Sequence, residues 1–399
     1  MSNPYLDYRG RIKKLQGIIS GKGYDAVVLS KIGSLCYFTG LVFKDRAAII
    51  IPAKGGDDDI YMVNINIEIE RMREESWLPN LIAWDFAKKT PGVAPQGSVV
   101  HTFNPAYVEA IGECLAKLKL EKGKIGIEKD DLVATEYEAL VDTLRGARIE
   151  NVADIPNRMQ VVKDKAEIEI MRRAAEITDA GMEAAFKALV VGATECEVAG
   201  AAEYAMRLAG AESFNYGMGG RVGTEIGSGY RSAYMYCWSM PPTLKRLQRG
   251  DIVTIDIHAM HQTYVSDLSL NGVVGQPSAA QKELEDVWKK GVHALLSAMK
   301  PGARICTAAM AARSAIEAAG WAKYNAALFG HGLGTSTRIP PIVSMNNTDM
   351  FELNMILNSV VVVTKPGVGG MRLEMPTLVT QDGGEPLAKS PLELVVRPV

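Results

Sequence analysis

Three short segments in the second half of the chain carry the side chains best suited to chemistry. In GDIVTIDIHAMHQTYVSD, Asp256 lies on one expected strand and Asp267 lies eleven residues later, on the strand that returns. Aspartate is unfavourable inside strands, and two facing aspartates repel each other unless a cation or a proton lies between them. The spacing therefore predicts a site that holds a cation or shares a proton.

A histidine, a lysine and a glutamate follow further along the chain. In FGHGLG, His331 lies between glycines, where the backbone can come close to a ligand. In VVVVTKPGVGGMRLEMP, Lys365 precedes a Pro-Gly turn and Glu374 lies inside the next strand. A lone acid or histidine is more often structural, but the set in this order indicates a catalytic pocket. We assign its catalytic residues as Asp256, Asp267, His331, Lys365 and Glu374.

The elements that must position these residues fall into two halves. Helix and strand patterns alternate up to about residue 150, which predicts a small α/β domain. Pro156 then interrupts the chain, and from Lys165 onward apolar residues recur at helical spacing. We therefore expect an N-terminal domain over 1–157 and a catalytic domain over 158–399.

The second half combines long helices with strands such as DIVTIDIHAM and VVVVT. Helices collected against an antiparallel sheet form an α+β architecture, which differs from the regular alternation of a doubly wound fold. No glycine-rich nucleotide-binding motif follows a strand. The helices are expected over 165–190, 193–209, 279–299 and 305–319.

Composition excludes several classes of protein. The chain has 399 residues, 44 basic and 46 acidic side chains that are interspersed, and five cysteines without paired spacing. No basic run suggests nucleic acid, and no apolar stretch approaches the ~20 residues of a membrane span. The polar N-terminus lacks the apolar core of a signal peptide. We expect a cytoplasmic protein that acts on a small molecule and binds neither nucleic acid nor membrane.

These motifs resemble the creatinase, aminopeptidase P and methionine aminopeptidase family, the peptidase M24-like proteins. GDIVTID and YVSD are similar to its two metal-binding aspartates, FGHGLG to its metal-binding histidine, and GMRLEMPTLVT to its last metal-binding glutamate. RMQVVKDKAEIEIMRRAAEITDAGM is similar to its domain junction. The resemblance covers nearly the whole chain. It implies a C-terminal pita-bread fold, a smaller N-terminal creatinase-type domain and a homodimer.

Three positions depart from the family pattern. Two-metal members use Asp, Asp, His, Glu and Glu, and the fourth ligand is a Glu directly before Pro-Gly, a place that we assign here to Lys365. Peptidase members also carry two further histidines, and Ser239 and Arg338 stand at the corresponding places. An ordinary dinuclear Xaa-Pro peptidase is therefore not expected.

Charge counting with Lys365 in the pocket predicts the metal content. Three carboxylates and one ammonium are balanced by one divalent ion, or by no metal if Arg338 and a protonated His331 supply the difference. Two divalent ions would leave about two uncompensated positive charges in a low-dielectric site. We favour a site without a cofactor, in which Lys365 fills the space beside His331, and we do not expect a dinuclear centre. The alternative is one Mn²⁺-like ion at Asp256, Asp267 and Glu374, with His331 as a further ligand.

The resemblance implies an enzyme that hydrolyses a C–N bond in a small amino-acid-derived or amidine-like compound, as creatinase and ectoine hydrolase do. His331 or Glu374 would activate water, and Lys365 and Arg338 would hold a substrate carboxylate. Two alternatives stay open. One is a lyase of the dimethylsulfoniopropionate-cleaving type, and the other is a non-catalytic binding protein with this fold.

Further residues are candidates for substrate binding beside Arg338. Arg46 lies in a segment that resembles the creatinase region reaching a neighbouring subunit's substrate. His258 lies two residues after Asp256 and faces the same side of the strand, where it could be an added ligand or base. The remaining candidates are Tyr230, Arg231 and Trp238.

Overall fold

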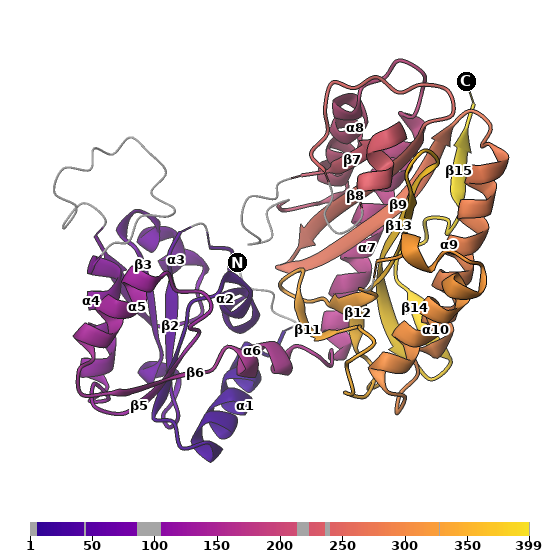
Figure 1. Cartoon of the computed structure of the whole chain (residues 1–399). Coiled ribbons are helices and arrows are strands. Elements are labelled where there is room, and N and C mark those ends of the chain that lie inside the picture. Colours follow the sequence, from indigo (N-terminus) through magenta and orange to yellow (C-terminus); the bar gives the residue numbers. More distant parts are fainter. Residues whose placement is uncertain are drawn as a thin grey trace. The chain divides into compact units, whose positions relative to one another are not determined.

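The chain forms two compact units, Met1–Met159 and Gln160–Val399. The division lies two residues beyond the boundary expected between 157 and 158. Figure 1 shows the elements of both units. The computed structural model describes residues 6–43, 45–85, 105–213, 223–235, 240–326 and 328–398.

The N-terminal unit contains a mixed six-stranded sheet with the order β4-β3-β2-β1-β5-β6. Its strands are β1 (Ala26–Leu29), β2 (Ala48–Pro52), β3 (Tyr61–Ile65), β4 (Asn80–Trp84), β5 (Lys124–Ile127) and β6 (Arg148–Asn151). Its helices are α1 (Tyr8–Gly21), α2 (Ile32–Thr39), α3 (Ile69–Glu75), α4 (Pro105–Lys117), α5 (Ala134–Thr143) and α6 (Asp154–Met159).

Apolar cores form on both faces of this sheet. Val27 of β1 packs in one core with Ile12 of α1, whereas its neighbour Val28 packs in a second core with Ile111 of α4. Because successive residues of a strand point to opposite faces, an uninterrupted apolar run suits a strand that is buried on both sides. The α/β domain expected for this half is therefore present.

The C-terminal unit contains a nine-stranded sheet with the order β11-β10-β12-β13-β9-β8-β7, in which β14 also pairs with β13 and β15 with β9. Its strands are β7 (Glu225–Ser228), β8 (Ile252–His261), β9 (Tyr264–Val274), β10 (Gly330–Gly332), β11 (Ile339–Ile342), β12 (Ile356–Lys365), β13 (Gly369–Thr380), β14 (Gly383–Pro386) and β15 (Leu394–Arg397). Its helices are α7 (Lys165–Lys187), α8 (Glu195–Ala209), α9 (Ala279–Ala298) and α10 (Ile305–Ala318).

Long helices pack against this largely antiparallel sheet, which confirms the expected α+β class. Helix α7 contacts β8 and β9, and α9 contacts β12 and β13 (Figure 1). The start of α7 is set locally, because the Asp164 side chain accepts from the Glu167 N–H and the Glu167 side chain accepts from the Asp164 N–H, both at 2.9 Å. This reciprocal pair is a capping box, which satisfies amides that have no partner within the helix.

The central strands of this sheet carry their buried ionisable residues on one face. In β8, Thr254, Asp256 and His258 alternate with Ile255 and Ile257, and all five are buried. Since alternate residues share a face, the apolar set lies on one face of the sheet and the polar set on the other. A buried polar face needs partners for its charges, so it marks where the site is.

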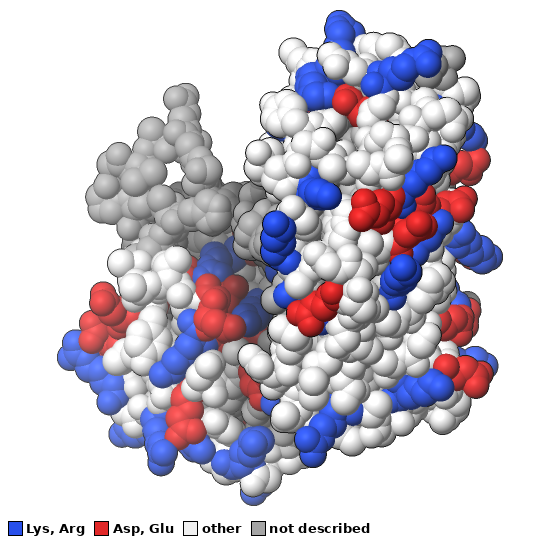
Figure 2. Space-filling view, turned by 45° about the vertical axis from the view of Figure 1, so that its right-hand side comes forward, with Lys and Arg blue, Asp and Glu red and all other residues white. Residues whose placement is uncertain are grey.

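The described helices and surface carry no sign of a membrane span or a single-sign charge field. None of the described helices is long and apolar enough to cross a membrane. On the face drawn in Figure 2, Lys and Arg are interspersed with Asp and Glu.

Candidate active site

Four buried side chains from three neighbouring strands form one cluster. Asp256 and His258 lie on β8, Asp267 on β9 and Glu374 on β13. The strand register aligns His258 with Asp267, and Ser269 of β9 with both Asp256 and Glu374. Residues that pair directly across strands share a face, so the register brings the four ionisable groups together. One ligand atom from each lies within 4.8 Å of all the others.

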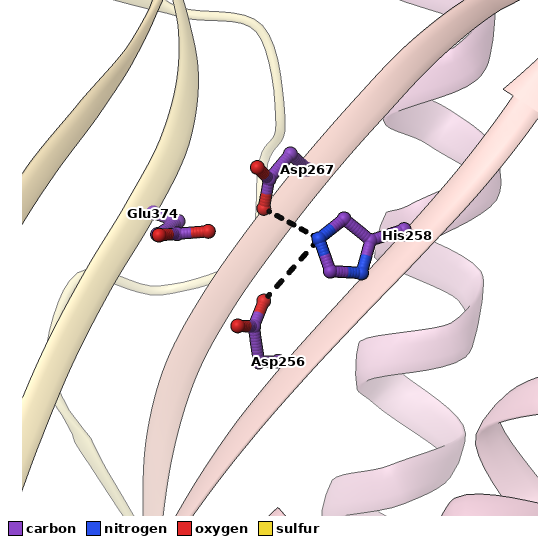
Figure 3. A group of neighbouring side chains, drawn as sticks. All are labelled: Asp256, His258, Asp267 and Glu374. Atoms are coloured by element: carbon purple, nitrogen blue, oxygen red, sulfur yellow. Dashed lines mark ion pairs between the residues drawn. The ribbon is translucent and has the colours of Figure 1, made fainter. Parts of the chain in front are cut away.

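One ring nitrogen of His258 faces both aspartates, and Glu374 lies on the far side of them from His258, on β13 (Figure 3). His258 Nε2 is 3.2 Å from Asp267 Oδ1 and 4.0 Å from Asp256 Oδ1. All four residues have exposed fractions of 5% or less. His258 is therefore part of the carboxylate cluster, where the roles considered for it are those of an added ligand or a base.

His331 of β10 lies on the other side of Asp267. Its Nε2 is 3.9 Å from Asp267 Oδ2, and its Nδ1 is 3.2 Å from the carbonyl oxygen of Gly332. A carbonyl only accepts, so this contact places the ring proton on Nδ1 and leaves the Nε2 lone pair facing the site. Nε2 has no hydrogen-bond partner among the residues that the structure describes.

The two histidines differ in charge. Burial lowers the pKa of His331 to about 4, and the positive charge of Arg338 acts in the same direction, so the ring is neutral at neutral pH. Burial alone would also lower the pKa of His258, but the charges of Asp267 and Asp256 outweigh it and raise that pKa to about 10. Only a neutral imidazole binds a metal, so an ion held beside Asp256 and Asp267 would have to displace the proton of His258.

The carboxylates are crowded. Burial, followed by the charge of Glu374, raises the pKa of Asp256 to about 6, and the same two causes raise the pKa of Asp267 well above its usual range. Burial opposes ionisation of Glu374 too, but the adjacent Arg372 outweighs it and lowers the pKa of that carboxyl. Carboxylates held this close ionise together only when a cation joins them.

Arg372 contacts this cluster through a permanently charged guanidinium, and the sequence analysis missed it. Its guanidinium pairs with Glu374 and lies 3.5 Å from Asp256 Oδ2, and the residue is only 2% exposed. It stands two residues before Glu374 on β13, so both side chains point to the same face. The alternation of Arg372 and Glu374 with apolar residues in GMRLEMP could have indicated from the sequence that Arg372 faces the site.

Two flanking residues carry opposite charges. Glu225 of β7 pairs in register with Asp256 and raises the pKa of that carboxyl, and Glu225 was also missed from the sequence. Arg338 acts electrostatically on His331, as described above, which agrees with a position near the site. With His258 in the neutral form that a metal ligand requires, the three carboxylates of the cluster and Arg372 sum to −2, and the flanking pair adds no net charge.

These residues fit a divalent cation. Carboxylate oxygens and imidazole nitrogens are ligands of Mn²⁺, Zn²⁺ and related ions. A net charge of −2 is costly in a buried site unless a bound cation balances it. His331 is 1% exposed and its Nε2 has no hydrogen-bond partner within the described parts of the chain, an observation that is independent of the acidic cluster and points to a ligand bound at this site.

Lys365 lies away from this cluster, unlike the expected position beside His331. Val360, not Lys365, pairs with Glu374, and Lys365 pairs with Gly369 next to the hairpin turn. Five residues of strand, at ~3.3 Å each, separate Lys365 from Val360 by roughly 16 Å. The Lys365 ammonium lies instead 4.4 Å from the ring centroid of Trp321. The Lys-Pro-Gly segment that suggested a ligand position is the turn itself.

Other predicted residues have local partners. Arg46 pairs with Asp131 at 2.8 Å and with Glu136, all inside the N-terminal unit. Arg231 donates to Glu195 at 3.1 Å. Tyr230 is 71% exposed. Trp238 and Ser239 lie outside the described residues.

Known proteins resemble the chain over nearly its whole length. Residues 169–381 match metallopeptidase family M24, and residues 11–162 match the creatinase/prolidase N-terminal domain. The Xaa-Pro dipeptidase of Pyrococcus horikoshii is 28% identical over 388 residues, covering 96% of this chain and 98% of the relative. That of Pyrococcus furiosus is 28% identical over 385 residues, covering 96% and 99%. The crystal structure of the prolidase from P. horikoshii superposes with a TM-score of 0.80 at 28% identity, covering 97% of this chain and 100% of that one.

These findings confirm the resemblance and the two-domain pita-bread architecture, and they overturn two expectations. The exclusion of an Xaa-Pro peptidase, and with it the preference for a creatinase-like reaction, is wrong, because full-length relatives are Xaa-Pro dipeptidases. The preference for a metal-free site is also wrong, because the matched family is one of metallopeptidases and the structure has a buried cluster suited to a metal. Both wrong expectations depended on placing Lys365 in the pocket.

Proposed function

The chain belongs to metallopeptidase family M24, and we propose that it is a metal-dependent dipeptidase that hydrolyses dipeptides of the Xaa-Pro type. Membership confirms the expectation of a hydrolase that cleaves peptide-like C–N bonds. The observation that carries the proposal is the buried cluster of Asp256, His258, Asp267 and Glu374, with the His331 Nε2 facing it. The full-length match to Xaa-Pro dipeptidases supports the substrate class.

The residues of the site have distinct tasks in this reaction. A divalent ion bound there supplies Lewis acidity for the scissile carbonyl. Asp256, Asp267 and Glu374 would hold it, and Arg372 keeps two of these carboxylates in place through its guanidinium. Arrangements of this kind lower a barrier because the charges are positioned before the reaction begins.

His331 and Arg338 would act on the substrate. The Nδ1–H of His331 is held by the Gly332 carbonyl, so Nε2 can accept a hydrogen bond from the dipeptide or hold a proton. Arg338, whose charge acts on His331, suits the free carboxylate that every dipeptide carries. Both roles need a small substrate that reaches into the buried site.

The test is hydrolysis of a dipeptide panel by the full chain. Leu-Pro, Met-Pro and Ala-Pro would be compared with Leu-Ala and Ala-Leu, after dialysis against EDTA and after addition of Mn²⁺ or Co²⁺. We expect metal-restored cleavage of the Xaa-Pro peptides. Absence of cleavage in every metal-loaded sample would refute the proposal.

Two finer expectations go with this proposal. A cytoplasmic location agrees with the charged composition and the unpaired cysteines, and a homodimer agrees with the family resemblance. Light scattering after size-exclusion chromatography measures the molar mass and so tests the homodimer directly.

A further inference from the structure

The carboxylate of Asp267 divides the site into two sides. Its Oδ1 faces His258, and its Oδ2 faces His331. Asp256, His258, Asp267 and Glu374 form a set of four donors within 4.8 Å of one another, in which Glu374 of β13 lies on the side of Asp267 that leads to β12. Glu225 belongs to the His258 side, since it pairs in register with Asp256. Beyond Glu374, in the direction of His331, the next strand of the sheet is β12.

The His331 side is bordered by strand β12, which offers no carboxylate that could bind a metal. The residue directly across from Glu374 is Val360, which is 4% exposed. Cβ atoms of such pairs lie about 4.5–5.5 Å apart, so the side chain at position 360 is the β12 neighbour of Glu374. Valine has no ligand atom. The sequence of β12, ILNSVVVVTK, contains no acidic residue.

Asn358, which lies two residues before Val360 on the same face of β12, is neutral. Asn358 pairs in register with His331 on one side and with Pro376 on the other, and its amide atoms have no hydrogen-bond partner among the described residues. An amide contributes no charge. It cannot replace a carboxylate in balancing a second cation.

The charge at the site matches one divalent ion. When His258 binds as a neutral ligand, the cluster carboxylates and Arg372 sum to −2, so one divalent ion gives a neutral site. Two ions would leave two uncompensated positive charges in a site whose residues are at most 5% exposed.

We propose that the chain binds one divalent cation, held by Asp256, Asp267, Glu374 and Nε2 of His258, and that Val360 is the residue that keeps a second cation from binding. This inference rests on the metal dependence of the proposed function and specifies it. The imidazole of His258 supplies a ligand on the same side as Asp256, while the position across from Glu374 supplies none.

The first test measures the metal and its nitrogen ligand without substrate. Purified full chain, stripped with EDTA and reloaded with excess Mn²⁺, would be desalted and analysed by mass spectrometry for metal content. We expect one ion per chain, and either two ions or none overturns the inference. Pulsed electron paramagnetic resonance of the Mn²⁺ chain would detect a directly bound nitrogen.

Matched histidine variants identify that nitrogen. His258→Gln should lose the nitrogen signal and weaken Mn²⁺ binding at least tenfold. His331→Gln should keep the signal. The control is His261→Gln on the same strand, whose ring faces Glu212 at 3.7 Å and lies outside the cluster. A signal lost in His331→Gln and kept in His258→Gln overturns the assignment of the ligand.

The second test places a carboxylate across from Glu374. Val360→Glu should raise the Mn²⁺ content from one to two ions per chain, whereas Val360→Gln, of equal size but uncharged, should stay at one. A folded Val360→Glu chain with one ion contradicts the role of Val360. If that variant does not fold, the wild-type metal content and the histidine variants still decide the inference.

These measurements separate the inference from the proposed function. A chain that binds one ion through His258 but cleaves no dipeptide refutes the dipeptidase proposal alone. A chain that cleaves dipeptides with two ions bound refutes the single-ion site alone.

Discussion

Replacing Arg372 by methionine should destabilise the metal-free chain strongly and the metal-loaded chain less. The guanidinium is buried, pairs with Glu374 and lies 3.5 Å from Asp256. At an effective dielectric constant of about 20, a 3.5 Å pair interacts with about 5 kcal/mol, and breaking a buried pair costs about 3–5 kcal/mol in practice. We therefore expect a loss of about 3–5 kcal/mol in the free energy of unfolding in EDTA.

A bound divalent ion neutralises the same carboxylates, so saturating Mn²⁺ should reduce this loss. Urea unfolding followed by circular dichroism, with and without Mn²⁺, measures both quantities. Arg372→Lys keeps the charge but not the planar fork, and it should lose less than the methionine variant. Arg173→Met is the control, because its partner Glu176 lies 2.9 Å away in a half-exposed pair of α7, and exposed pairs contribute about 0–1 kcal/mol. The reasoning fails if Arg372→Met is as stable in EDTA as Arg173→Met, or if Mn²⁺ leaves its deficit unchanged.

Three further outcomes are expected. Lys365→Ala should keep its Mn²⁺ content and most of its dipeptidase activity, because the ammonium lies over Trp321; a loss of Mn²⁺ binding would return Lys365 to the site. Burial raises the pKa of Glu128 to about 7 from 4.5, so its contribution to stability is full below pH 4.5 and is lost as the pH rises through 7. Glu128→Gln should remove up to about 3 kcal/mol of this pH-dependent loss in the free energy of unfolding. An equal loss between pH 5 and pH 8 in the variant and the wild type would disprove the effect. Gly332→Ala should cost about 1–3 kcal/mol, because a Cβ there would lie 2.2 Å from the Pro340 oxygen; an unchanged melting temperature would count against it.

Local patterns in the sequence determined the class of the fold and most of the cluster. The capping box at Asp164 starts α7, and the alternation of polar and apolar residues in β8 turns Asp256 and His258 to one face. These features depend on neighbours a few residues apart, so the chain itself displays them. Asp267 and Glu374 follow from the same alternation on the neighbouring strands.

Only the tertiary structure decided which residues face one another across strands. The β12–β13 register places Val360 opposite Glu374 and moves Lys365 to the hairpin turn, and a short motif match could not reveal this. Arg46 likewise has its partners Asp131 and Glu136 far along the chain. Register is determined by turn geometry and by burial of whole strand faces, and a slip of one residue turns every side chain to the other face. The ligand residues can thus be read from the sequence, but the residues beside them, and with them the expected number of ions, come from the pairing of the strands.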